Sequence, residues 1–206
     1  MAFIGIKVPL EAGRLLAKLD VPGEKESPSE YHITLLHLGD NWPISDISKA
    51  MEAGYEVISK IKPFHVKMKK VSHFPPREGH PIPIIAPVES EELHELRKKL
   101  ATRFNKDKIE FSKTFKDFKP HITLAYSEDK HDDYKIDPPV EFVVNEVVLW
   151  AGDLGDERLF ITFPLKGPER HKHSFLVQKV EIFYKLAQNP SQEYLTATKE
   201  RRGKDR

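Results

Sequence analysis

The tetrapeptide His-Ile-Thr-Leu occurs twice in this 206-residue chain, at residues 32–35 and 121–124. Residues i and i+2 of an extended strand point to one face, so each copy presents a histidine and a threonine together. An imidazole titrates near neutral pH and serves as a general acid or base. A threonine hydroxyl donates a hydrogen bond to a negatively charged oxygen. Each copy therefore joins a proton-transfer group to an anion-binding group: His32 with Thr34, and His121 with Thr123.

Two such pairs around one point suit the transfer of a phosphoryl group. One imidazole accepts the proton of the attacking oxygen, and the other gives a proton to the leaving oxygen. The two hydroxyls bind the non-bridging oxygens and stabilise the charge of the transition state. This chemistry requires no metal ion and no other cofactor, and we expect none. The symmetry of the pairs leaves open which histidine is the acid and which is the base.

The sequence around the two copies repeats as well. Each copy is preceded by a segment with the pattern of a strand followed by a helix: "IKVPLEAGRLLAKL" in the first half and "IAPVESEELHELRKKL" in the second. The strands "YHITLLHLGD" and "PHITLAYSED" then close the two units. Two repeats are too few for a solenoid. They predict two lobes related by a pseudo-twofold axis, with the motif strands facing each other across a shared cleft.

Three helices are expected in addition to the short helix of the first unit. Apolar spacing predicts one over residues 45–61, with Ser45 or Asp46 as its N-cap. The second unit's helix should begin at a capping serine, Ser90, which acidic residues follow in the first turn. Apolar residues between 175 and 186 predict an appended helix, which a polar, basic and mobile tail follows.

Strand patterns complete the expected fold. Residues 64–74 alternate as a half-exposed strand that loses phase near Lys70, and residues 140–153 and 158–167 form two final strands. We therefore expect an α+β, bilobal protein with two pseudo-twofold-related lobes of antiparallel sheet and helices around a central cleft. The main domain spans 1–167, and a C-terminal helical extension spans 168–206.

Within that domain, the lobes are expected at about residues 1–75 and 76–167, and an exchange of strands between them stays open.

Composition excludes some classes of function. The chain has no cysteine, which excludes disulfides, thiol catalysis and cysteine-based zinc sites. No apolar run reaches the roughly 18 residues of a membrane span, and the N-terminus lacks a signal peptide's apolar region. We expect a soluble, cytoplasmic monomer.

The paired motifs, and the second one's setting "FKPHITLAY", resemble the 2H phosphoesterase superfamily over roughly residues 1–167. That superfamily includes LigT-like 2′–5′ RNA ligases, 2′,3′-cyclic phosphodiesterases, and phage and viral enzymes that cut 2′–5′ or cyclic oligonucleotides. The resemblance implies a bilobal α+β fold, catalysis by His32 and His121, and phosphate binding by Thr34 and Thr123. The implied partner is RNA or an oligonucleotide with a phosphate that involves a ribose 2′ oxygen.

Two alternatives remain beside a metal-independent phosphodiesterase. The first is the same enzyme run in reverse, as a 2′–5′ RNA ligase. The second is a non-catalytic RNA-binding module, in which the histidines are incidental and the basic segment 97–119 and the tail hold RNA by salt-dependent contacts. That basic segment can equally be an ordinary solvated surface.

Four other residues bear on the surroundings of the motifs. Phe74 is placed near the mouth of the cleft, where it can stack on a base, although a packing role is equally expected. Arg77, in the loop that follows, is a candidate for binding a second phosphate. Strict alternation places His37 and Tyr126 on the opposite face from the motif histidines.

Overall fold

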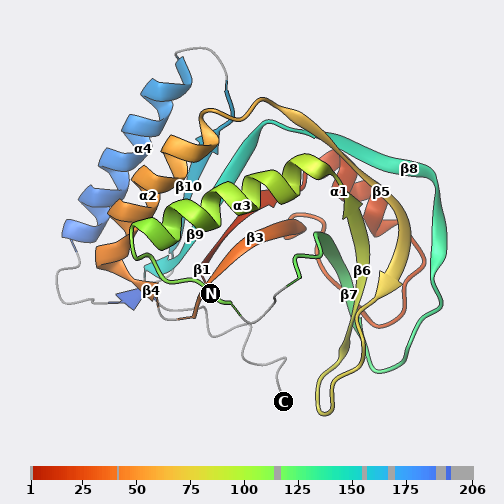
Figure 1. Cartoon of the computed structure of the whole chain (residues 1–206). Coiled ribbons are helices and arrows are strands. Elements are labelled where there is room, and N and C mark those ends of the chain that lie inside the picture. The colour runs from red at the N-terminus through yellow and green to blue at the C-terminus, as the bar shows by residue number, and fades with distance from the viewer. Residues whose placement is uncertain are drawn as a thin grey trace.

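The protein is described from a computed structural model that covers residues 2–40, 42–113, 117–154, 157–166, 170–188 and 194–195. Residues 196–206 of the expected basic tail lie outside this range. The described chain forms two main antiparallel sheets and four helices (Figure 1). The expected α+β fold with a C-terminal helix is confirmed.

The first sheet has four strands, in the spatial order β10 (Glu157–Pro164), β9 (Glu146–Leu154), β1 (Ala2–Lys7) and β3 (His32–Gly39). The second has five, in the order β2 (Glu24–Lys25), β7 (His121–Ser127), β6 (Ile82–Glu89), β5 (Phe64–His73) and β8 (Tyr134–Val144). The two-residue strands β4 (Trp42–Pro43) and β11 (Tyr194–Leu195) pair separately. Residues 1–75 and 76–167 each contribute strands to both sheets, so the sheets do not divide the chain at residue 75.

The helices are α1 (Leu10–Ala17), α2 (Ile44–Ile58), α3 (Glu91–Lys106) and α4 (Arg170–Ala187). Helix α1 follows β1 of the first sheet but contacts β8 of the second, whereas α3 follows β6 of the second sheet and contacts β3 of the first. Helices α2 and α3 lie side by side over the first sheet (Figure 1). This reciprocal exchange joins the two halves through one continuous core.

Local sequence explains where α3 begins but not where α2 begins. The Ser90 hydroxyl accepts a hydrogen bond from the Leu93 amide, as its capping pattern predicts. The inner face of α3 consists of four buried apolar residues spaced three or four apart: Leu93, Leu96, Leu100 and Phe104. The predicted cap at Ser45 or Asp46 is wrong, because α2 begins at Ile44 directly after Pro43 and has no side-chain cap.

The expected single strand over 140–153 is also wrong. Strand β8 ends at Val144 and β9 begins at Glu146, because the first pairs with β5 and the second pairs with β1 and β10. The loss of phase expected near Lys70 is confirmed as a register shift between Met68 and Lys70 of β5. Among the described helices, none combines the length and apolar character that a bilayer crossing requires.

Candidate functional site

The two motif strands have equivalent partners in the two halves of the chain. In each half, the strand before the helix pairs antiparallel with the motif strand in the same register. The equivalent pairs are Lys7–His32, Ile6–Ile33 and Gly5–Thr34 in the first sheet, and Pro87–His121, Ala86–Ile122 and Ile85–Thr123 in the second. The repeat therefore extends from the sequence to individual backbone pairs.

Each motif strand also contains a β-bulge at the same place, just after its threonine. The register skips Leu35 in β3 and Leu124 in β7, so two consecutive residues oppose one partner residue. The pairs Leu35–Leu36 and Leu124–Ala125 are both buried, although strict alternation would expose one member of each. A bulge shifts the alternation of every later residue in its strand.

Because of these bulges, the expected positions of His37 and Tyr126 are wrong. Both residues fall on the face that carries the histidine and threonine of their strand, which we call the motif face. His37 is half-buried and Tyr126 is exposed, whereas their neighbours on either side are buried. His37 and Tyr126 occupy equivalent positions in the repeat. Only the local backbone irregularity, which has no clear sequence signal, brings them to this face.

The motif strands meet where the two sheets adjoin. Strand β3 is the edge strand of the first sheet, and it contacts β7 of the second. The short strand β2 pairs with Tyr126 and Ala125 of β7, and the Glu26 amide donates to the Leu124 carbonyl 2.9 Å away. Since β2 lies only a few residues before His32, this pairing fixes the start of one motif against the strand of the other.

A glycine permits this close pairing. Gly23 has a φ of +83°, and a Cβ at this position would lie 2.0 Å from the Tyr126 carbonyl oxygen. Only glycine combines that backbone conformation with so close an approach.

Each motif histidine is oriented by a hydrogen bond to the backbone carbonyl two residues before it. Nδ1 of His32 lies 2.8 Å from the Glu30 carbonyl oxygen, and Nδ1 of His121 lies 2.7 Å from the Lys119 carbonyl oxygen. A carbonyl oxygen only accepts, so each Nδ1 carries the proton and donates it. The neutral ring then has its lone pair on Nε2, the nitrogen that remains for proton transfer.

An aromatic ring from another segment of the chain contacts each imidazole. The His32 ring stacks on Phe3, with 4.7 Å between centroids, and Phe3 in turn stacks on Trp150 at 4.5 Å. The His121 ring meets the edge of Phe74 at 4.6 Å in a perpendicular arrangement. Phe74 therefore lies beside a motif histidine, and its contact with a substrate base stays a prediction.

The Phe3 ring reaches His32 because Gly5 has no side chain. A Cβ on Gly5 would lie 2.6 Å from the Ile33 carbonyl oxygen and 3.2 Å from the Phe3 ring. We expect Gly5→Ala to destabilise the fold by about 1–3 kcal/mol, because the added methyl overpacks the strand pair and displaces the ring. Denaturant unfolding measures this loss. An unchanged unfolding free energy would show that the ring's position does not depend on Gly5.

His121 is a half-buried ring whose surroundings affect its titration. Burial lowers its pKa from the usual value, while the hydrogen bond to Lys119 raises it to a smaller degree. His121 is therefore neutral at physiological pH, which is the form that accepts a proton. Burial also lowers the pKa of His37, opposed by the Asp40 carboxylate.

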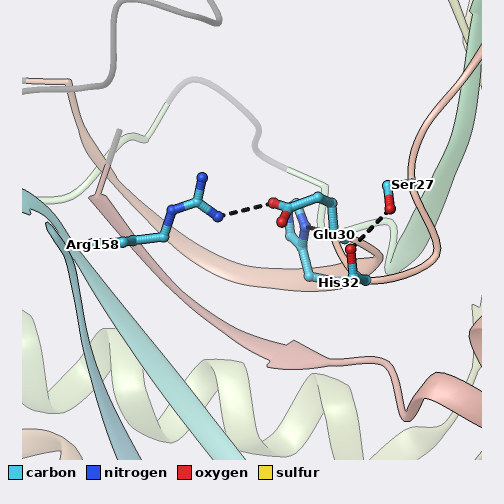
Figure 2. A network of polar contacts seen from close by, with 5 residues as sticks. Ser27, Glu30, His32 and Arg158 are labelled. Atoms are coloured by element: carbon cyan, nitrogen blue, oxygen red, sulfur yellow. Dashed lines mark hydrogen bonds and ion pairs between the residues drawn. The ribbon is translucent and has the colours of Figure 1, made fainter. Parts of the chain in front are cut away.

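Beside His32, an ion pair connects the first sheet to the segment before the motif. The Arg158 guanidinium lies 3.0 Å from the Glu30 carboxylate, two residues before His32 (Figure 2). The Arg158 and Glu30 side chains are 44% and 36% exposed, so the pair adds little to stability. Its consequence is positional, because it ties β10 to the residue two positions before His32.

Arg77 and the basic segment 97–119 are the other candidates for binding phosphate. Arg77 lies at the exposed tip of the β5–β6 hairpin, where its backbone bridges to His80. In the basic segment 97–119, Arg103 pairs with Glu56 and Asp107. Phosphate binding by Arg77 and anion attraction by the segment stay predictions. The described residues contain no cluster of three or more potential metal ligands.

Comparison with known proteins shows which solved structures share this fold. A search of curated proteins gave no match. Among solved structures, TT0787 of Thermus thermophilus superposes with a TM-score of 0.65 at 23% identity, covering 82% of this chain and 100% of that one. E. coli LigT complexed with 3′-AMP superposes with a TM-score of 0.60 at 19% identity, covering 80% of this chain and 94% of that one. These likenesses show the shared fold.

The sequence itself matches a family model. Residues 17–156, which include both motifs, match the model described as the 2′-5′ RNA ligase superfamily. The match spans more than half of the chain, and the fold agrees with it. The chain belongs to the 2′-5′ RNA ligase superfamily, the 2H phosphoesterases.

Proposed function

We propose that this protein is a metal-independent phosphodiesterase that acts on RNA or oligonucleotide phosphodiesters involving a ribose 2′ oxygen. The observation that carries the proposal is the repeated orientation of the two histidines. Each donates Nδ1–H to the carbonyl two residues earlier, which leaves Nε2 of both rings for proton transfer on adjoining strands. Two histidines that served only in packing would not need to carry their protons on the same ring nitrogen.

In the proposed reaction, His121 is the base and His32 is the acid. His121 suits the first role because burial lowers its pKa and keeps the ring unprotonated. For a 2′,3′-cyclic phosphate, water attacks phosphorus and gives its proton to His121. The bond to one ribose oxygen breaks, and the doubly protonated form of His32 gives its Nε2 proton to that oxygen. Thr34 and Thr123 donate hydrogen bonds to the non-bridging oxygens, whose negative charge grows in the transition state.

This assignment of the base predicts the pH dependence of activity. A base with a lowered pKa stays deprotonated below the usual value of about 6.5, so the acidic limb of kcat/KM should fall below that pH. Because the Phe74 edge packs against the His121 ring, its removal should reduce the burial of that ring and raise its pKa toward the usual value. We expect Phe74→Ala to move the limb to higher pH in a pH–rate series. A limb that does not move would exclude His121 as the base.

The experiment that tests the function is an assay in EDTA against a panel of phosphodiesters. The panel holds a 2′,3′-cyclic nucleotide, 2′–5′ and 3′–5′ oligoadenylates, and cyclic dinucleotides. Turnover of a member with a 2′ linkage, lost in His121→Ala, supports the proposal. Strong binding of RNA that weakens with salt, without turnover of any member, would instead favour the RNA-binding module.

Ligation is a second candidate, favoured by the family that the sequence matches. The same two histidines serve the reverse reaction, in which a 5′-hydroxyl attacks a 2′,3′-cyclic phosphate and the ribose 3′ oxygen leaves. Incubation of RNA fragments with these two ends distinguishes the two directions. A product with a new 2′–5′ bond demonstrates ligation, and a product with an opened cyclic phosphate demonstrates hydrolysis.

A further inference from the structure

A row of aromatic side chains extends from His32 across the first sheet to its outer strand. We call Phe3, Trp150 and Phe160 the aromatic strip. Phe3 of β1 is the register partner of Trp150 in β9, and Trp150 is the partner of Phe160 in β10. Partners in antiparallel strands place their side chains on one face, with Cβ atoms about 5 Å apart. Since Phe3 stacks on His32, the strip is continuous with the motif face.

The aromatic strip becomes more exposed with distance from His32. Phe3 is 4% exposed, Trp150 is half-buried, and Phe160 is 57% exposed. Along β10 the flanking residues Leu159 and Ile161 are buried on the opposite face, so Phe160 is directed away from the core. A single exposed phenylalanine is ordinary on a protein surface. Its continuity with a stacked Trp150 and a motif histidine makes it the outer end of a surface suited to a ligand.

An ion pair accompanies this surface. Arg158 precedes Phe160 by two residues in β10, so the two side chains share a face. The Arg158 guanidinium pairs with the Glu30 carboxylate, two residues before His32. This pairing offsets its charge, so the aromatic rings carry the argument, because the bases of single-stranded nucleic acid stack on such rings.

We propose that the aromatic strip binds the base of a second nucleotide, on the leaving side of the scissile phosphate. The preferred substrate is then an oligonucleotide with at least two nucleosides, and a cyclic mononucleotide fills only part of the site. This inference rests on the proposed function, in which His32 is the acid. The acid protonates the leaving oxygen, so the nucleoside that departs is the one beside His32 and the strip.

The reaction of a 2′–5′ dinucleotide illustrates this placement. The 3′-hydroxyl beside the linkage attacks phosphorus and gives its proton to Nε2 of His121. The bond from phosphorus to the 5′ oxygen breaks, and Nε2 of the doubly protonated His32 ring gives its proton to that oxygen. The products are a 2′,3′-cyclic phosphate and a nucleoside with a free 5′-hydroxyl, which leaves the aromatic strip.

The test compares two substrates in three proteins. Wild type, Phe160→Ala and the control Tyr184→Ala are assayed on 2′–5′-linked diadenosine and on 2′,3′-cyclic AMP. Tyr184 is an aromatic residue of α4 that is 67% exposed and outside the sheet. We expect Phe160→Ala to lower kcat/KM about tenfold on diadenosine, by the loss of one stacked base, with cyclic AMP unaffected. Equal losses on both substrates, or no loss on diadenosine, would overturn the inference.

Fluorescence separates this inference from the proposed function. The chain has two tryptophans, and Trp42 is only 2% exposed, so a bound base should quench Trp150 selectively. Diadenosine is titrated into His121→Ala, with Trp150→Phe as the check on the source of the signal. If wild type turns over neither substrate, the proposed function fails, and quenching that weakens about tenfold with Phe160→Ala still supports the strip as a base-binding surface. Absence of quenching would refute it.

Discussion

Replacement of His121 by alanine is expected to lower kcat on the preferred 2′-linked phosphodiester by about 10²–10⁴-fold, and His32→Ala should cause a similar loss. Each variant removes one proton-transfer group from the transition state. Binding should change less than kcat, because the threonines and the aromatic neighbours still hold the substrate. Single-turnover kinetics with purified variants measure the loss at the chemical step.

A matched control excludes a general effect of losing a histidine. His65 is exposed on β5, and His65→Ala should retain wild-type activity. Because the two motif histidines act in one step, the double variant should lose less than the product of the single losses. Near-normal activity in either single variant would refute two-histidine catalysis, provided that its unfolding transition matches that of the wild type.

Replacement of Thr123 by valine is expected to lower kcat by about a hundredfold, and Thr34→Val should do the same. Valine keeps the shape and the β-branch of threonine but has no hydroxyl to donate. The lost hydrogen bond strengthens as charge develops on the phosphate oxygens, so the effect should appear in kcat more than in KM. Steady-state kinetics on the same substrate measure it.

Two further variants sharpen this second test. Thr→Ser at either position keeps the hydroxyl and should retain most of the activity. Thr102 lies exposed on α3, and Thr102→Val should leave kcat unchanged. Equal activity of the valine and serine variants would show that the motif hydroxyls do not bind the phosphate.

The helix pattern and the two histidine–threonine pairs could be read from the sequence because they depend on neighbouring residues. The sequence pattern predicted a helix at the position of α3, and Ser90 predicted its start. The chemistry of each pair follows from two side chains on one strand face. The repeat predicted that the second motif belongs with the first, and the shared register of Gly5–Thr34 and Ile85–Thr123 agrees with that repeat.

Non-local pairing decided the rest. Alternation misplaced His37 and Tyr126, because the bulges at Leu35 and Leu124 arise from how each strand meets its partner. One apparent strand became β8 and β9 because its two halves pair in different sheets.

The sequence by itself thus determined which side chains can transfer protons and bind phosphate. Only the tertiary structure decided what surrounds them. Phe3, Trp150 and Phe160 lie far from His32 in the chain, and strand pairing across the first sheet places them in a row that begins at the His32 ring. Local pattern records the direction of a side chain, whereas its neighbours depend on which distant strands share a sheet.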